Sequence, residues 1–262
     1  MKPKRLLTRL LLSLSALFFW VAVWWLIAVH VGIPLLLPTP LSVAKRLIAL
    51  IATAKFWETT ALSLARILLG LLLSVLLGIV LAILTAKLTA ARILLRPLMT
   101  AIRATPVAAF IILIWLWIGK DEVPTIITVL IALPVIYKNV ETGILGIPEP
   151  LLEMAKTFRI PRWKRLLKLD IPAVLPSFHA ALQTAIGLGW KAGVAAEIIV
   201  RPTLAIGRAI SDANYNLETE DLFAWTLTVV LLSLLIEAVA SLLLSRLFRA
   251  ALPTESGKED AV

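Results

Sequence analysis

The sequence contains no cysteine and only two histidines, His30 and His179, in 262 residues. The absence of cysteine excludes disulfides, a thiol nucleophile and a cysteine-ligated metal site. A zinc site needs three or four ligands, so two histidines alone are more often packed or interfacial residues than metal ligands. The sequence therefore offers few groups for metal or general-base chemistry.

Charged residues are also scarce. They make up 16% of the chain, whereas 60% of its residues are hydrophobic; average soluble proteins carry about 25% charged residues. The net charge of +10 could suggest a nucleic-acid partner, but the basic residues lie at the edges of apolar segments. We interpret them as a topology signal of an integral membrane protein, with membrane lipid and not nucleic acid around it.

Several catalytic motifs are missing as well. There is no G-x-x-x-x-G-K-[ST] sequence, so the chain is not expected to hold nucleotide phosphates by itself. Neither H-E-x-x-H nor G-x-S-x-G occurs, which argues against a membrane metalloprotease and a serine hydrolase. We expect no catalytic residues and no cofactor in this chain.

The apolar segments predict an all-α integral membrane protein with six transmembrane helices. The first follows a basic N-terminus and is longer than the apolar region of a signal peptide, which favours an uncleaved span. A short amphipathic segment after it, Leu41–Ala54, is too charged to cross and is expected to lie on the outer surface. The predicted spans are residues 10–30, 60–86, 97–119, 123–137, 171–200 and 222–244.

The distribution of basic residues predicts the orientation of these spans. On the proposed cytoplasmic side lie 16 of the 26 Lys and Arg residues, and 6 lie on the opposite side. This bias places both termini in the cytoplasm. We expect residues 1–252 to form one transmembrane domain and residues 253–262 to form a polar tail.

One cytoplasmic segment is basic and amphipathic, Glu153 to Pro176, with the sequence EMAKTFRIPRWKRLLKLDIPAVLP. It predicts two short helices in a row, the first with Glu149 and Glu153 in its opening turn and the second starting after Pro161. Such a segment is typical of a juxtamembrane helix attracted to anionic lipid headgroups. A second interpretation comes from a resemblance.

The segment resembles the EAA loop of permease subunits of binding-protein-dependent ATP-binding cassette (ABC) transporters, whose pattern is E-A-A-x-x-x-G followed by I-x-L-P. Glu153 and Ala155 match the pattern, and Met154 replaces its first Ala. Arg159 stands where the family usually has Gly. If that turn needs a positive φ, Arg159 costs about 1–2 kcal/mol. Either the turn is built differently, with Ile160 and Pro161 setting it, or the docking contact is altered.

Other positions resemble the nitrate, sulfonate and taurine branch of the same family, and together the likeness covers most of the chain. The order and spacing of the matching positions are more specific than any single match. The matching positions are Arg66, Gly70, Pro106, Ile114-Trp115, Gly119, Trp190 and Ala196-Glu197.

The resemblance implies a type I ABC importer fold in a prokaryotic cell membrane. Two copies of the chain would form the solute pathway, a separate cytoplasmic ATPase dimer would bind ATP and Mg²⁺, and an extracytoplasmic solute-binding protein would deliver a sulfonate, nitrate, taurine or vitamin precursor. The loop, about residues 149–170, would dock on the ATPase. The residues that the resemblance assigns to this docking are Glu153, Ala155, Lys156, Thr157, Arg159, Arg162 and Trp163.

Charged residues inside the spans are candidates for the pathway, because burying a charge in lipid is costly. Trp190, Lys191 and Glu197 are the candidates in the fifth span, and Trp190 and Glu197 share one face of it. Glu197 either faces the pathway near its outer end, or is an ion-pair or interface residue of the bundle. An ion- or proton-coupled secondary transporter, with Lys191, Glu197 or Glu237 as coupling groups, is the alternative function; a membrane enzyme or scaffold is a third.

Overall fold

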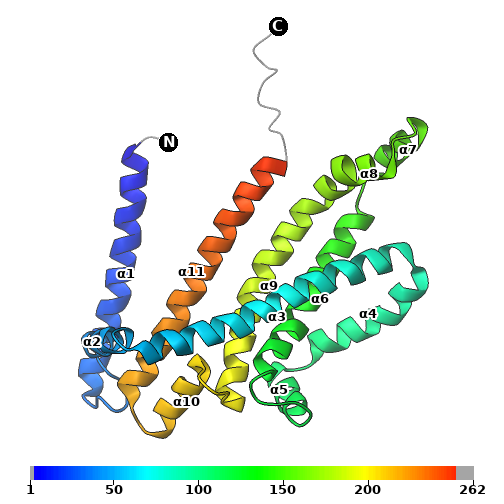
Figure 1. Ribbon diagram of the computed structural model, residues 1–262. Coiled ribbons are helices and arrows are strands. Elements are labelled where there is room, and N and C mark those ends of the chain that lie inside the picture. The colour runs from blue at the N-terminus through cyan, green and yellow to red at the C-terminus, as the bar shows by residue number, and fades with distance from the viewer. Residues whose placement is uncertain (1–2, 252–262) are drawn as a thin grey trace.

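The computed structural model describes residues 3–251, and all regular structure in this range is helical (Figure 1). The predicted all-α class is therefore confirmed, while the predicted polar tail, residues 253–262, lies outside the described residues. The helices are α1 (Pro3–Val31), α2 (Pro40–Ile51), α3 (Ala54–Lys87), α4 (Thr89–Ala104), α5 (Val107–Trp115), α6 (Val123–Leu145), α7 (Glu149–Thr157), α8 (Arg162–Arg165), α9 (Ile171–Val200), α10 (Ile206–Tyr215) and α11 (Thr219–Ala251), with a π-helical turn (Leu166–Asp170) between α8 and α9.

Five helices are long and apolar enough to cross a membrane: α1, α3, α6, α11 and the helix that runs from Arg162 to Val200. They correspond to five of the six predicted spans. The third predicted span, residues 97–119, is not one straight helix, because α4 and α5 are bent by 103° at a short break. Pro106 causes the break: it has no N–H to donate, and it holds Thr105 before it in an extended conformation, with ψ 132°.

The core is built by α3, α6 and α9, and small residues let these helices approach closely. A Cβ added to Gly70 of α3 would lie 2.6 Å from the carbonyl oxygen of Thr125 on α6. A Cβ added to Gly193 of α9 would lie 2.6 Å from Ile67. These glycines therefore fix how near the three helices can lie to one another.

A Gly70→Ala substitution is expected to lower the free energy of unfolding by about 1–3 kcal/mol. The new methyl group would collide with the backbone of α6, which cannot move aside as a side chain does. A Gly187→Ala variant is the control, since its Cβ would meet only the Glu237 carboxylate at 3.4 Å, an ordinary contact. Thermal unfolding in detergent measures both, and equal midpoints for the two variants would contradict the packing described.

The basic segment differs from its prediction in one respect. Its first helix, α7, ends as expected, but α8 is not a separate second helix, because it continues through the π-helical turn into α9. In that turn the Ile171 N–H bonds to the carbonyl of Leu166. The wider turn accommodates Pro172, whose ring would otherwise disrupt a regular helix at this point.

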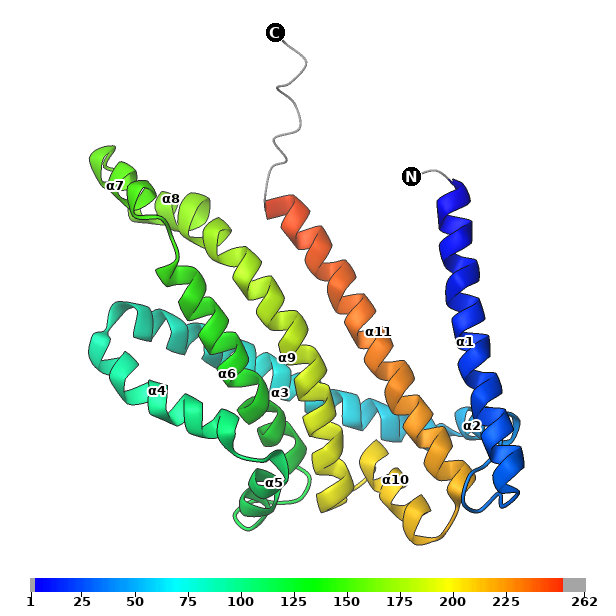
Figure 2. The ribbon, with the colours of Figure 1, turned by 180° about the vertical axis from the view of Figure 1, so that it is seen from behind.

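Helix α1 stands at the edge of the molecule, beside α2 and α11 (Figures 1 and 2). Its Trp24 stacks on Phe223 of α11 with ring centroids 5.8 Å apart and donates a hydrogen bond to the carbonyl of Pro38 at 3.1 Å. The start of α1, the end of α11 and α7 lie at one end of the molecule, opposite α2, α5 and α10. Which side of the membrane each end faces stays a prediction.

Candidate functional site

Residues 149–168, called here the α7–α8 tip, lie at the end of the molecule where α1 begins and α11 ends (Figure 1). The tip carries all seven residues that the sequence assigned to docking. Ala155 is buried within the chain itself, at 3% exposure, so its small size is explained by packing in α7. The other six are exposed: Glu153, Lys156, Thr157, Arg159, Arg162 and Trp163.

The turn after α7 contains a left-handed residue. Arg159 has φ 48°. Its N–H bonds to the carbonyl of Lys156, and the Ile160 N–H bonds to the carbonyl of Ala155, both at 3.0 Å. This pair of bonds is a Schellman motif, in which glycine is the favoured residue at the left-handed position. The alternative, a different turn set by Ile160 and Pro161, is therefore wrong.

Replacing Arg159 with Gly is expected to stabilise this helix end by about 1 kcal/mol, because glycine adopts a positive φ without steric cost. Exchange of the Ile160 amide, measured by hydrogen–deuterium exchange on the full-length protein, should slow about fivefold. An Arg162→Gly variant removes the same charge at a helical position and should give no protection. Faster exchange at Ile160 in the Arg159→Gly variant would contradict the strain assigned to this turn.

The surface of the tip combines basic, apolar and acidic groups. Phe158 and Trp163 are 74% and 61% exposed, and the Lys164 ammonium lies 5.5 Å from the Trp163 ring centroid. Arg165 pairs with Asp170 at 3.3 Å, whereas no ion pair involves Glu153 within residues 3–251. Exposed apolar groups beside unpaired charges are typical of a protein-binding surface. Docking of a partner on the tip stays a prediction.

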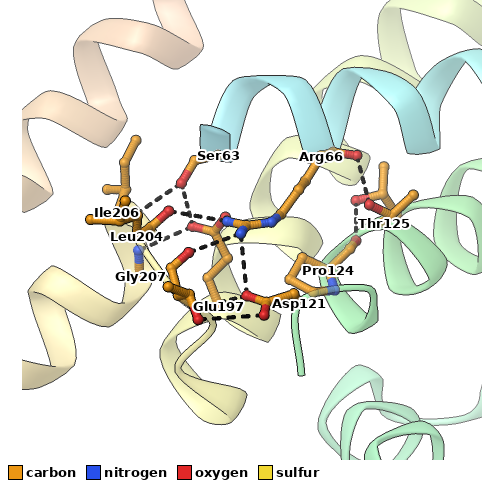
Figure 3. Close-up of polar contacts among 11 residues, drawn as sticks. Ser63, Arg66, Asp121, Pro124, Thr125, Glu197, Leu204, Ile206 and Gly207 are labelled. Carbon is orange, nitrogen blue, oxygen red and sulfur yellow. Dashed lines mark hydrogen bonds and ion pairs between the residues drawn. The ribbon is translucent and has the colours of Figure 1, made fainter. Parts of the chain in front are cut away.

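A second polar cluster lies at the opposite end, around Glu197 (Figure 3). Its side chain is fully buried, and one carboxylate oxygen accepts hydrogen bonds from the Ser63 hydroxyl at 2.9 Å and the Gly207 N–H at 3.1 Å. The Arg66 guanidinium lies 4.0 Å from the other oxygen. Of the two interpretations of Glu197, this placement favours the one in which it is paired within the bundle.

Arg66 extends this cluster to two connecting segments. It donates to the backbone carbonyls of Thr203 and Leu204 at 2.8 and 3.1 Å and to Asp121 at 3.2 Å. Asp121 in turn accepts the Thr203 N–H at 2.6 Å. Together with Glu197, these contacts join α3, the α5–α6 connection and the start of α10, and we call the whole set the Glu197 clamp (Ser63, Arg66, Asp121, Glu197, Thr203, Gly207).

The other pathway candidates of α9 lie in different surroundings. Trp190 is buried, and its ring N–H donates to the carbonyl of Val229 on α11 at 3.3 Å. Lys191 is exposed, and within the described residues no hydrogen bond or ion pair involves it. The structure therefore brings Trp190 and Glu197 into the packed interior and leaves Lys191 outside it. A pathway role for these residues stays a prediction.

Sequence reasoning missed several functional candidates. Ser63 offers one signal, its place one helical turn before Arg66. Glu141 on α6 is fully buried and accepts hydrogen bonds from Tyr137 at 3.2 Å and Lys138 at 3.1 Å. The one sequence feature that pointed to Glu141 was Lys138, the basic residue three positions earlier.

A charged cavity of about 500 Å³ lies between α2, α10 and α11, at the end opposite the tip. Arg46 on α2 and Asp221 on α11 form an ion pair in its wall, with one guanidinium nitrogen 2.8 Å from the carboxylate. The hydrogen bond to Asp221 raises the pKa of Arg46. Arg208 and Asp212 of α10 form a second pair at 3.4 Å. The cavity therefore presents both signs of charge to the solvent.

Comparisons with known proteins agree on one family. Residues 74–249 match the model of a family described as binding-protein-dependent transport system inner membrane component. The chain is 34% identical over 226 residues to a putative aliphatic sulfonates transport permease protein of Escherichia coli (strain K12), covering 85% of each chain. It is 28% identical over 234 residues to the taurine transport system permease protein of the same strain, covering 86% of this chain and 84% of the relative.

A further sequence relative and a solved structure also match the chain. A riboflavin transport system permease protein of Chloroflexus aurantiacus is 32% identical over 209 residues, covering 79% of this chain and 78% of the relative. An inward-facing structure of the methionine ABC transporter MetNI aligns with a TM-score of 0.54 at 19% identity, covering 75% of this chain and 94% of that chain. The structural likeness supports the type I importer fold.

Proposed function

Because this chain belongs to the family of binding-protein-dependent transport system inner membrane components, we propose that it is the permease subunit of an ATP-driven importer. The family and the apolar helices make it a multi-pass protein of the inner membrane. In the proposed importer two copies of the chain surround the solute pathway as a homodimer, with both termini in the cytoplasm. The permease itself is not the enzyme of the system.

The α7–α8 tip is the observation that carries this proposal. It offers an unpaired carboxylate, Glu153, beside exposed basic and apolar side chains. We assign Glu153 the role of anchoring the tip in a groove of a cytoplasmic ATPase, with Arg159, Arg162 and Trp163 contributing to the contact. ATP and Mg²⁺ would be bound by that ATPase. Closure of the ATPase dimer would then switch the spans between inward-facing and outward-facing states.

The proposed substrate is a small solute of the sulfonate, nitrate, taurine or vitamin-precursor class. Named relatives of the chain carry taurine, aliphatic sulfonates and riboflavin in their descriptions. A solute-binding protein would deliver the solute at the end that holds the charged cavity of α2, α10 and α11. The paired charges of that cavity, including Arg46 and Asp221, offer a polar surface to such a protein.

The test is to purify the tagged, full-length protein from its native membranes in mild detergent and to identify by mass spectrometry what accompanies it. We expect a soluble ATPase with a phosphate-binding loop, and a solute-binding protein found with it would name the substrate. Recovery of the protein alone, active in transport after reconstitution without ATP, would overturn the proposal in favour of an ion- or proton-coupled secondary transporter.

A further inference from the structure

A polar groove runs between α9 and α11 within the membrane-spanning segments. Gln183 and Thr184 of α9 and Glu237 and Ser241 of α11 line it, together with two apolar residues, and its volume is about 520 Å³. All four polar side chains are exposed in the single chain. Amide, hydroxyl and carboxylate groups thus meet at a depth where the sequence is otherwise apolar.

Two opposite charges share this part of the surface without touching. A Cβ added to Gly187 would lie 3.4 Å from a Glu237 oxygen, so the carboxylate rests against α9 at that residue. Lys191 is one helical turn further along α9, on the same face as Gly187. Within residues 3–251 neither Lys191 nor Glu237 has a hydrogen bond or an ion pair.

The hydrocarbon layer of the membrane is an unfavourable environment for the face of α9 and α11 that carries the groove. An unpaired charge in the hydrocarbon layer is costly, and such residues in membrane proteins face the bundle interior or water. On α11 the apolar residues Leu235 and Leu242 point away from Glu237, at helical positions on the opposite side, and both are more than half exposed. Leu234, one turn before Glu237, is also exposed on this side of α11, so it is the charge of Glu237 that sets the face apart from one that suits lipid.

We propose that the groove and Lys191 line the water-filled part of the solute pathway, and that they suit a small solute that carries both an anionic group and an ammonium or similar donor. The anionic group passes Lys191, while Glu237 accepts the donor, with Gln183, Thr184 and Ser241 supplying hydrogen bonds. This inference rests on the proposed function, because it takes the chain to be a transporter, and it assigns the pathway to this face of α9 and α11.

Single cysteines test it directly, since the chain contains none to remove. Full-length Thr184→Cys and Ser241→Cys variants in membrane vesicles are treated with a charged methanethiosulfonate reagent, which reacts only where water reaches the thiol. Leu235→Cys and Leu242→Cys are the matched controls on the leucine side of α11. We expect the groove cysteines to react at least about tenfold faster, as the difference between water and lipid contact requires.

Two results would overturn the inference. Groove cysteines that react as slowly as the two controls would show that water does not reach this face. Unreactive groove cysteines that form disulfides between two copies, for example at Ser241→Cys, would show that the groove is a dry contact between permease chains.

A separate measurement tests the roles assigned to the charges of Lys191 and Glu237. It compares the rates at which an anionic and a cationic methanethiosulfonate reagent react with Thr184→Cys. Lys191 lies two turns from this position, roughly 10 Å along the axis. A unit charge at that distance changes the local concentration of a charged reagent by about 2- to 15-fold. Because each charge attracts one reagent and repels the other, Lys191→Met should lower the anionic-to-cationic ratio and Glu237→Gln should raise it by at least about fourfold; an unchanged ratio in both would overturn the assigned charges.

The labelling needs neither an ATPase nor a solute-binding protein, so its failure is separate from that of the proposed function. Unreactive groove cysteines in a chain that co-purifies with an ATPase would reject the groove and keep the importer. Reactive groove cysteines in a chain that transports without ATP would keep the groove and reject the importer.

Discussion

A Glu153→Lys variant is expected to lose ATP-driven solute uptake almost completely while remaining folded in the membrane. Glu153 is exposed and has no ion-pair partner within the described residues, so the fold does not depend on it. The substitution removes one of the two acids of the tip, Glu149 and Glu153, and places a like charge among its basic neighbours. Breaking a charged contact at an interface costs about 2–5 kcal/mol, which is more than a tenfold loss of ATPase binding.

The measurement is solute uptake by proteoliposomes that contain the permease with its ATPase and solute-binding protein, together with the amount of ATPase retained. Glu58→Lys is the matched control, because Glu58 is also an exposed acid with no ion pair in the part of the chain that the structure describes, but it lies on the first turns of α3, away from the tip. It should transport normally. Full uptake by the Glu153→Lys variant would reject the docking role of the tip, and equal losses in both variants would point to a general effect of charge reversal.

A Glu197→Ala variant is expected to fold poorly. The substitution leaves the Ser63 hydroxyl and the Gly207 N–H without their acceptor and removes the carboxylate opposite Arg66. Removing one partner of a buried charged contact costs about 3–5 kcal/mol, against a total stability of about 5–15 kcal/mol for a typical protein. Glu197→Gln keeps an acceptor oxygen for the two donors and should lie between the wild type and the Ala variant.

Folded yield by size-exclusion chromatography and the thermal unfolding midpoint measure this effect. Glu237→Ala is the control: it removes an acid from a neighbouring span, but one that is exposed and has no ion-pair partner among the described residues. Its yield and midpoint should match the wild type. A Glu197→Ala protein that unfolds at the wild-type midpoint would show that the Glu197 clamp is not needed for stability.

The spans were predictable because lipid imposes one simple requirement, a run of apolar residues with its backbone hydrogen bonds closed within the segment. The break between α4 and α5 could not be predicted from this requirement. Residues on both sides of Pro106 are apolar, so the hydropathy pattern continues where the backbone does not. Proline alone was the local signal, and the size of the bend depends on what α5 packs against, including Val123 and Ile127 of α6.

The α7–α8 tip and the Glu197 clamp also differ in how far they could be predicted from the sequence. The positive φ of Arg159 was one of two alternatives at the sequence level, because a helix end is decided by a few adjacent residues. Ser63 and Glu197 meet across 134 positions of the chain, and no local pattern states which distant side chains will share a hydrogen bond. The sequence therefore offered pairing of Glu197 within the bundle as one interpretation but could not decide for it. The contacts of Asp121 and Thr203 in the Glu197 clamp could not be predicted.

The helix that runs without a break from Arg162 to Val200 has a mechanical consequence. Its 39 residues span roughly 58 Å at the rise of an α-helix, with the tip at one end and the Glu197 clamp near the other. If the clamped end acts as a fulcrum, a displacement of about 5 Å at the tip turns the whole lever by only about 5°. In the proposed importer, a large displacement of the tip would therefore become a small tilt where α9 packs on α3 and α6.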